Sequence, residues 1–412
     1  MTDLLVLAHR LPYPPNKGDK VRSYHLVRHL ARSHRIFLGT FVDDPVDEVH
    51  VPALRQLCED VYVGRLFPRA AKIRSLCGIV TGEPLSLPFY REAGLSSWIE
   101  RTLALHPIRT ALVFSSPMAQ YVISRPELNI LMDFVDVDSA KWSQYAKSLD
   151  WPLSRIYTRE GRRLLDYERR VASRASCAFF VTEAERALFL KSAPECAAKV
   201  KVLGNGVDAE YFSPQPGIPS PYPDGELALV FTGTMDYRPN VDAVRWFATE
   251  VLPQLRTNRP HLRFYIVGMR PTAAVRALDG DGVVVTGSVP DVRPYLQHAA
   301  LAVAPLRIAR GIQNKVLEAM AMARPVVVAQ ECADAFADGP QPPFARARSV
   351  GDFVRASESL LRDAADAAAI GRQARQFVVE HYSWNRQLAA IERFLHGRQP
   401  RSSESSLAAA AQ

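Results

Sequence analysis

A lysine and a glutamate stand three residues apart where an apolar helix face should begin. The stretch RGIQNKVLEAMAMARPVV (310–327) predicts a loop, a helix that starts near Ile312, and a buried strand. Lys315 and Glu318 then project from the same side of that helix near its N-terminal end. Free N–H groups and the helix dipole attract anions there, and Gly311 lets the backbone approach a ligand. The lysine suits a pyrophosphate, and the glutamate suits two adjacent hydroxyls such as those of a ribose.

A second interpretation of this pair needs no ligand, because an i,i+3 surface ion pair is worth a few tenths of a kcal/mol. Taken alone, Lys315 and Glu318 fit it. Gly233, Gly268 and Gly287 each end a predicted strand and permit close backbone approach, although a single glycine more often serves only a turn. No G-x-G-x-x-G follows a predicted strand, which argues against a dehydrogenase.

The elements that would position these residues are strands alternating with helices. Continuous Val, Ile and Leu runs indicate strands covered on both faces, and the helices between them indicate parallel crossovers. The predicted strands are 3–8, 35–41, 110–116, 129–135 and 177–182 in the first half, and 227–233, 263–268, 282–287, 300–306 and 324–330 in the second. The predicted fold class is α/β, with two doubly wound parallel-sheet (Rossmann-like) domains. Ligands of such sheets bind at the carboxyl ends of the strands.

Composition places the boundaries of these domains. We predict an N-terminal domain over 1–204 and a linker over 205–226, where prolines and glycines interrupt both kinds of element. A second domain follows over 227–382. A C-terminal helix over 383–397 is expected to return to the first domain, and the low-complexity segment 398–412 is predicted to be a disordered tail.

Length, charge and cysteines limit the class of protein. The 412 residues, 48% of them hydrophobic, exceed one ordinary core. We expect a cytoplasmic protein, because no run of about 18 apolar residues or secretory signal occurs. The formal charge of +8 indicates an anionic partner, for which a nucleotide, a phospholipid surface and nucleic acid are all candidates. Five scattered cysteines fit reduced thiols better than disulfides or a zinc site.

Several motifs together resemble a known family. They are NGVD (205–208), FTGTMDYRPNVDAVRWF (231–247) and GIQNKVLEAMAMARPVV (311–327), and the likeness runs from PPNKGDKVRSYHLVRHLA to YSWNRQLAAIERFL. The chain resembles the family-four retaining glycosyltransferases, which have the GT-B fold of two such domains facing a cleft. Within that family it looks most like the sugar transferases associated with exosortase and exopolysaccharide gene clusters, for which DFVDVDSAKWSQYA is also suggestive.

The resemblance implies that a nucleotide-diphosphate sugar, the donor, binds in the C-terminal domain. Glu318 matches the second glutamate of the family's Glu, seven residues, Glu motif, which holds the ribose. The first glutamate, beside the donor sugar, falls at Arg310, which is a departure from the family. The backbone N–H groups of Gly311, Ile312 and Gln313 are then the expected contacts with sugar or phosphate.

A second departure concerns the diphosphate. Thr234 follows Gly233 at the donor site, where the family commonly has an arginine. Arg238 and Lys315 are therefore predicted to replace the arginine and lysine that stabilise the leaving diphosphate, and we assign the catalytic role to them.

In the N-terminal domain the resemblance places a glycine-rich loop beside the acceptor and the diphosphate. PPNKGDK (14–20) occupies that place, with Gly18 as the close-approach residue and Asp19 after it. An ordinary Pro/Gly loop is the alternative. Asp136 is expected to point toward the acceptor, and Asp138 to cap a helix that starts at Ser139.

We predict no metal site. An Asp-x-Asp pair such as Asp136 and Asp138 binds a divalent metal in the other large glycosyltransferase fold, but here the second domain supplies the nucleotide features. His25 and His29 lie one helical turn apart without a suitable third ligand. A histidine frequent in this part of the family is missing, so no catalytic base is identifiable.

The implied reaction is sugar transfer with retention to a glycan or polyprenyl-linked acceptor, in exopolysaccharide assembly and without a cofactor. The leaving diphosphate is stabilised electrostatically, and the acceptor proton passes to the departing phosphate. Two alternatives stay open: a catalytically inactive nucleotide-sugar-binding protein, suggested by Arg310, and a nucleotide-sugar epimerase. A donor panel separates them.

The segment 155–174 carries much of the positive charge. On a helical projection seven arginines and one acid, Asp166, fall within about 140°, and the apolar residues gather opposite. The arginines are Arg155, Arg159, Arg162, Arg163, Arg169, Arg170 and Arg174. A solvated helix face is one interpretation. The other is contact with anionic lipid, which would make the protein peripheral on the inner face of the plasma membrane. Nucleic acid is not expected, because interleaved aromatics and a recognisable module are absent.

Overall fold

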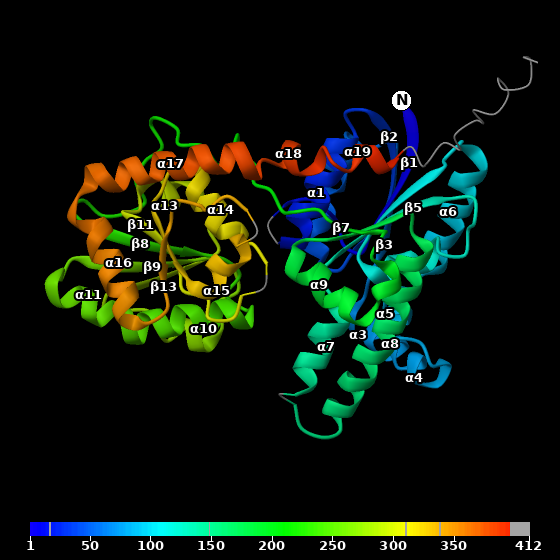
Figure 1. Ribbon diagram of the computed structural model, residues 1–412, viewed down its shortest axis with the longest axis horizontal. Helices are drawn as coiled ribbons and strands as arrows, with labels where there is room; N and C mark the ends of the chain where they lie inside the picture. Colours follow the sequence, from blue (N-terminus) through cyan, green and yellow to red (C-terminus); the bar gives the residue numbers. More distant parts are fainter. Residues whose placement is uncertain (16–17, 148, 310, 338, 396–412) are drawn as a thin grey trace, which may run out of the picture. The chain divides into compact units, whose positions relative to one another are not determined.

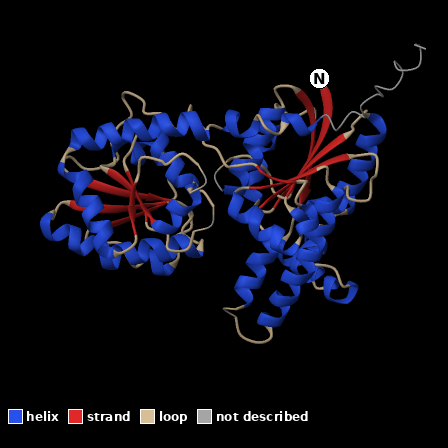
Figure 2. Cartoon of the chain, in the orientation of Figure 1, coloured by secondary structure: helices blue, strands red, loops and turns tan. Residues whose placement is uncertain are grey.

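The computed structural model describes residues 1–15, 18–147, 149–309, 311–337 and 339–395. The chain divides into two compact units. An N-terminal unit comprises Met1–Leu203 together with the chain from Leu388 onward, and a C-terminal unit comprises Gly204–Gln387. Each unit is a parallel sheet between layers of helices (Figures 1 and 2).

The sheet of the N-terminal unit has seven parallel strands in the order β3-β2-β1-β4-β5-β6-β7. The order reverses on either side of β1, as in a doubly wound sheet. The strands are β1 (Thr2–Ala8), β2 (His34–Val42), β3 (Asp60–Arg65), β4 (Thr110–Phe114), β5 (Asn129–Val135), β6 (Cys177–Phe180) and β7 (Val200–Val202).

Helices of this unit cover both faces of the sheet, and α7 and α8 form a long pair that projects from it (Figure 1). The helices are α1 (Gly18–Leu30), α2 (Val51–Arg55), α3 (Pro68–Ser75), α4 (Cys77–Thr81), α5 (Ser86–Phe89), α6 (Ala93–Leu105), α7 (Asp138–Ala146), α8 (Leu153–Arg174), α9 (Glu183–Ser192) and α19 (Glu392–Leu395).

Two charged side chains of α1 are fully buried in this unit. The Arg22 guanidinium donates to both carboxylate oxygens of Asp133 on β5, at 2.7 and 3.1 Å, and to the carbonyl oxygen of Leu203 at 2.8 Å. Lys20 Nζ lies 2.7 Å from an Asp47 carboxylate oxygen. Because removing either partner would leave a buried charge unpaired, these contacts fix α1 firmly against the sheet.

The C-terminal unit has six parallel strands in the order β10-β9-β8-β11-β12-β13. They are β8 (Leu227–Thr232), β9 (Leu262–Val267), β10 (Val283–Gly287), β11 (Leu301–Ala304), β12 (Val326–Ala329) and β13 (Ala345–Ala347). The helices are α10 (Arg238–Trp246), α11 (Leu252–Asn258), α12 (Ala273–Arg276), α13 (Arg293–His298), α14 (Asn314–Ala321), α15 (Gln330–Ala333), α16 (Val350–Arg362), α17 (Ala364–Tyr382) and α18 (Trp384–Leu388).

The predicted fold class is confirmed, and each of the ten predicted strands is present within a few residues of its predicted ends. Three strands were missed: β3, β7 and β13. All three are sheet edges, and each exposes part of its residues, so none forms the continuous apolar run of a strand covered on both faces.

The C-terminal part of the chain differs in detail from the predicted helix over 383–397. Two short helices, α18 and α19, are separated by a turn at residues 389–391. The predicted tail over 398–412 lies outside the described residues. Within the described ranges, no helix combines the length and the apolar character needed to cross a bilayer.

Candidate functional site

The carboxyl ends of β8 and β9 meet in very close backbone contact. Gly233 and Gly268, which follow these strands, have φ of 156° and 157°. A Cβ added to Gly268 would lie 1.6 Å from the carbonyl oxygen of Gly233. Glycine is therefore required at position 268 by this close approach of two backbone segments. Gly287, the last residue of β10, has a left-handed φ of 69°.

Lys315 reaches from the first turn of α14 to the end of β8. Its Nζ lies 3.0 Å from the position that a Cβ on Gly233 would occupy, and it donates to Asn240 Oδ1 at 2.6 Å. The same ammonium group lies 4.0 Å from the centroid of the Phe231 ring, a cation–π contact. Asn240 in turn donates from Nδ2 to the carbonyl oxygen of Thr234 at 2.8 Å. The lysine is thus held at the strand end and is not a loose surface group.

Burial perturbs both charged groups of α14. It lowers the pKa of Lys315 to about 7, and Cys332 and Glu318 oppose this shift. It raises the pKa of Glu318 to about 7, against the effect of Lys315. Both side chains therefore exchange protons near neutral pH. Paired titratable groups whose pKa values are shifted in opposite directions are typical of functional sites, which argues against a simple surface ion pair.

The start of α14 is close to its predicted position. The helix begins at Asn314 rather than near Ile312, and its first N–H groups receive no side-chain cap from Gln313. Gly311 has φ of 65°, which favours glycine, and its carbonyl oxygen accepts from Gln313 Nε2 at 3.1 Å. Ile312 packs against the core of the unit.

Asn314 adds a polar atom that the sequence analysis did not single out. Its Oδ1 is buried and has no hydrogen-bond partner within the described part of the chain. An unpaired buried acceptor is costly. A donor from a ligand bound at the start of α14 would satisfy it.

Of the two arginines predicted at the donor site, the structure describes one. Arg238 is the first residue of α10 and is exposed, two positions before Asn240. Arg310 lies outside the described residues.

The structure therefore brings Gly233, Thr234 and Lys315 together, with Glu318 one turn along α14. Asn240 was missed, because the residue that it positions lies 75 positions further along the chain and no local pattern links them.

In the N-terminal unit, Gly18 and Asp19 begin α1, after β1. A Cβ on Gly18 would meet nothing within 4 Å, so the backbone is open on that side. The Asp19 carboxylate accepts from Arg10 Nη1 at 2.5 Å and lies 3.5 Å from His9 Nε2. Burial opposes its ionisation, but His9 and Arg10 outweigh burial and hold the pKa of Asp19 well below its usual range. Asp19 is thus a constantly charged group at the start of α1.

Lys141 occupies the space between the two aspartates that follow β5. Its Nζ lies 2.8 Å from an Asp136 oxygen and 3.1 Å from an Asp138 oxygen. Burial alone would lower the pKa of Lys141, but Asp138 and Asp136 together raise it above its ordinary value. Among the described residues, no three His, Cys, Asp or Glu side chains are grouped so as to hold a metal ion.

The predicted capping role of Asp138 is wrong. Helix α7 begins at Asp138 itself, with Val137 as the cap residue and no side-chain cap. The start of α7 is supported from α8 instead: the Glu168 carboxylate accepts from Ser139 Oγ at 2.5 Å and from its N–H at 3.3 Å. Burial and then Asp138 raise the pKa of Glu168 to about 8.

Three of the seven arginines in the stripe of α8 are engaged with the protein. Arg159 donates to the carbonyl oxygens of Gly78 and Glu83, at 2.6 and 3.2 Å. Arg169 pairs with Glu195 at 2.9 Å, and Arg174 donates to two carbonyl oxygens of the chain. Arg155, Arg162 and Arg163 are exposed.

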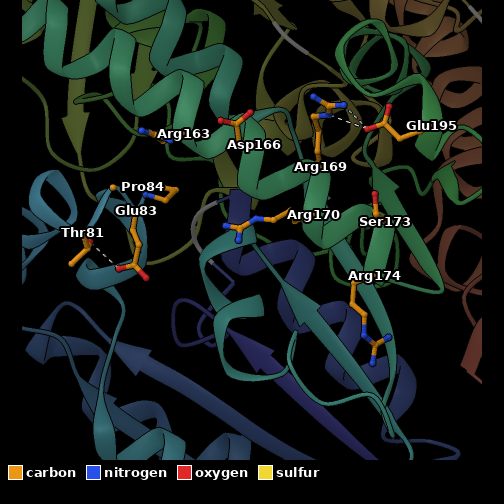
Figure 3. Close-up of a pocket in the computed structure, with 11 residues that line it drawn as sticks. Thr81, Glu83, Pro84, Arg163, Asp166, Arg169, Arg170, Ser173, Arg174 and Glu195 are labelled. Carbon is orange, nitrogen blue, oxygen red and sulfur yellow. Dashed lines mark hydrogen bonds and ion pairs between the residues drawn. The ribbon is translucent and has the colours of Figure 1, made fainter.

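Part of the stripe lines a pocket of about 890 Å³ between α8 and the turn at 81–84 (Figure 3). The arginines that line it are accompanied by Glu83, Asp166 and Glu195. The stripe is therefore not a uniform basic face, and charge reversal at Arg159 would damage the fold. The lipid interpretation of this segment stays a prediction.

Comparisons with known proteins agree with this architecture. Residues 226–363 match the family model described as glycosyl transferases group 1. No curated protein matches the sequence.

Solved structures match nearly the whole chain at low identity. Sucrose-phosphate synthase from Thermosynechococcus elongatus has a TM-score of 0.67 at 16% identity, over 96% of this chain and 98% of that one. Anabaena HepE in complex with UDP and glucose has a TM-score of 0.65 at 14% identity, over 95% and 100%. WaaG, a glycosyltransferase involved in lipopolysaccharide biosynthesis, has a TM-score of 0.61 at 18% identity, over 96% and 100%. The chain therefore has the GT-B fold of two parallel-sheet units, and most of its C-terminal unit is similar to the glycosyl transferases group 1 family.

Proposed function

We propose that the protein transfers a sugar from a nucleotide-diphosphate donor to a glycan or lipid-linked acceptor, with retention. One observation carries the proposal: Lys315 Nζ is held beside Gly233 at the end of β8, one helical turn from Glu318. The position matches where parallel sheets bind nucleotides. The structure of Anabaena HepE with UDP and glucose supports a uridine diphosphate sugar as the first donor to try.

The proposed roles of the donor-site residues are as follows. Lys315, together with Arg238, would stabilise the charge that develops on the diphosphate as the bond from the anomeric carbon to the phosphate oxygen breaks. The N–H groups at the start of α14, which have no side-chain cap, would add the positive end of the helix dipole near the phosphates. Glu318 would accept hydrogen bonds from the two ribose hydroxyls. With these fixed charges, we propose that the reaction needs no metal ion.

The acceptor side is proposed to involve Gly18, Asp19 and Asp136 of the N-terminal unit. The acceptor hydroxyl forms the new bond to the anomeric carbon, and its proton passes to the departing phosphate. An acceptor of the kind used in exopolysaccharide assembly, presented at the inner face of the plasma membrane, fits this proposal.

A donor panel tests the proposed reaction. The protein is incubated with nucleotide sugars, with and without glycan and polyprenyl-phosphate-linked acceptors, and with excess EDTA in a parallel series. Nucleotide release that depends on the acceptor and survives EDTA would support transfer without metal. Interconversion of the sugars would indicate an epimerase, and saturable binding without turnover would indicate an inactive binding protein.

Replacing Glu318 with Gln is expected to weaken nucleotide-sugar binding by about 10- to 150-fold. The amide keeps one weaker acceptor oxygen, and a hydrogen bond to a charged group is worth about 1.5–3 kcal/mol. Calorimetric titration of the folded variant measures the change. Glu358→Gln, in α16 of the same unit, is the control and should leave the affinity unchanged. Equal affinities of the native protein and Glu318→Gln would rule out the ribose contact.

Binding of a nucleoside diphosphate is expected to take up a proton at pH 8. The pKa of Lys315 is lowered to about 7 without ligand, so the amine is mostly neutral at pH 8. A bound diphosphate favours the ammonium form and raises this pKa. Affinity should therefore fall as pH rises above 7, by up to about tenfold per pH unit. Calorimetry with UDP in buffers of different ionisation enthalpy counts the proton, and Lys315→Met should abolish the uptake. Proton uptake that persists in this variant would assign the effect to another group.

A further inference from the structure

An apolar face of α3 and α4 points away from the protein. Ile73, Leu76 and Val80 follow the i, i+3, i+7 spacing that normally marks the buried side of a helical segment. Their exposed fractions are 71%, 52% and 90%. The opposite side carries the small residues Ala71 and Gly78, which are buried against the protein. We name Phe67, Ile73, Leu76, Ile79 and Val80, all exposed, the outward apolar face.

This segment is firmly attached to the unit. Arg159 of α8 donates to the carbonyl oxygen of Gly78 in α4, and Arg74 of α3 donates to those of Pro88 and Phe89 at 2.7 Å each. The fully buried Glu160 of α8 accepts from the N–H groups of Leu85 and Ser86, at 2.6 and 3.1 Å. A Cβ on Gly78 would lie 3.1 Å from the carbonyl oxygen of Glu83, so α4 approaches the following chain closely. The outward apolar face is therefore held outward by the fold.

Exposed cations accompany the face. Arg69 and Lys72 are exposed on α3, and the exposed Arg155 and Arg162 lie on α8, the helix that holds α4 through Arg159. Within the segment 67–82 the charged residues are Arg69, Lys72 and Arg74, and none is acidic. Glu83, just after α4, pairs with Arg91. Apolar side chains with Arg69 and Lys72 on the same segment complement a bilayer surface that contains anionic lipids.

The α7–α8 pair offers a second exposed group. Trp151 and Leu153, just before and at the start of α8, are exposed, and α4 and this helix pair project on the same side of the sheet in Figure 1. Tryptophan is enriched at the membrane interface, where its ring spans the boundary between head groups and acyl chains.

We propose that the outward apolar face inserts into the interfacial layer of a membrane rich in anionic lipids, with Arg69 and Lys72 on the head groups. This assigns membrane contact to α3 and α4, where the sequence analysis had considered the arginine stripe of α8. The exposed face alone supports the proposed membrane binding. The role of that binding, which is to hold the N-terminal unit near a lipid-linked acceptor, rests on the proposed function.

Vesicle co-sedimentation tests the proposal. Phosphatidylcholine vesicles with and without phosphatidylglycerol are compared at low and high salt. The native protein should bind only the anionic vesicles, and binding should weaken with salt. The triple variant Ile73→Ser, Leu76→Ser, Val80→Ser should bind roughly 10- to 100-fold more weakly. Arg69→Glu with Lys72→Glu should cost roughly 30-fold.

The matched control uses two other exposed valines of the same unit. Val46→Ser with Val49→Ser, both 73% exposed in the 3₁₀ turn Pro45–His50, should leave vesicle binding unchanged. All substituted side chains are exposed, so the variants should keep native thermal unfolding, which is measured in parallel. UDP titration of the same variants separates vesicle binding from donor binding, and it should be unaffected.

A cysteine already in the chain reports the depth of contact. Cys77, in α4, is exposed, and the other four cysteines are buried. Its reaction with a maleimide should slow in the presence of anionic vesicles and not in the presence of neutral ones. Three results would overturn the proposal. The first two are equal binding to neutral and anionic vesicles, and a loss of vesicle binding in the Val46/Val49 control equal to that in the triple variant. The third is self-association of the protein without lipid that the triple variant abolishes.

Discussion

Replacing Lys315 with Met is expected to lower turnover of the nucleotide sugar by about tenfold to a thousandfold. The Lys315 ammonium group lies at the end of β8, where Asn240 and the ring of Phe231 hold it in place. Loss of one fixed electrostatic stabiliser of a leaving group typically has this effect. Steady-state kinetics with the donor found by the panel measure it.

The same substitution should leave the fold intact. Burial disfavours the charged lysine, so an apolar side chain of similar length removes a cost, and a methionine sulfur packs well against Phe231. The thermal midpoint of Lys315→Met should therefore not fall. Arg276→Met, at an exposed position of α12 in the same unit, is the control and should keep full activity.

Asn240 provides an independent check on the geometry. Asn240→Leu should lower turnover less than Lys315→Met, because the ammonium group remains but loses its positioning acceptor. The two changes combined should cost little more than Lys315→Met alone, since residues that act through one contact are not additive. Full additivity, or unchanged turnover in Lys315→Met, would show that this lysine does not stabilise the diphosphate.

Replacing Gly268 with Ala is expected to destabilise the C-terminal unit by roughly 4 kcal/mol or more, the range of severe backbone clashes. The added Cβ would lie 1.6 Å from the carbonyl oxygen of Gly233, a backbone atom that cannot rotate away. The φ of 157° adds strain for any residue with a side chain. For a unit of this size the thermal midpoint should fall by roughly 10 °C or more.

Gly351→Ala is the matched control for this prediction. Gly351 lies in α16, where the nearest neighbour of an added Cβ is the mobile end of the Arg355 side chain at 3.4 Å. Alanine in a helix restricts the unfolded chain, so stability should stay equal or rise slightly. Thermal and urea unfolding of both variants give the comparison. Similar midpoints for Gly268→Ala and the native protein would mean that β8 and β9 can separate at their ends without cost.

Some features of the fold and of the candidate site were predictable from the sequence because they depend on local patterns. The ten predicted strands, including the edge strand β10, each contain a continuous apolar run, whereas the edge strands β3, β7 and β13 lack that run. Lys315 and Glu318 were predicted to lie side by side because residues three positions apart project from the same side of a helix.

Contacts between distant segments were not predictable in this way. Asn240 holds Lys315 from a position 75 residues earlier in the chain, and no periodicity relates these two residues. The spacing of Ile73, Leu76 and Val80 would by itself predict a buried helix face. Only the packing of Ala71 and Gly78 on the inner side shows that it faces out.

The return of the chain to the N-terminal unit at Leu388 has a consequence for biogenesis. The carbonyl oxygen of Leu395 accepts from Thr110 Oγ1 at 2.9 Å, and that of Phe394 accepts from Asn129 Nδ2 at 3.2 Å, at the starts of β4 and β5. Ile391 and Leu395 are buried there. On a ribosome that adds about 5–20 residues per second, this last piece is synthesised roughly 10–40 s after Leu203. The nascent N-terminal sheet must therefore wait, with these strand ends uncovered, until the whole C-terminal unit has been made.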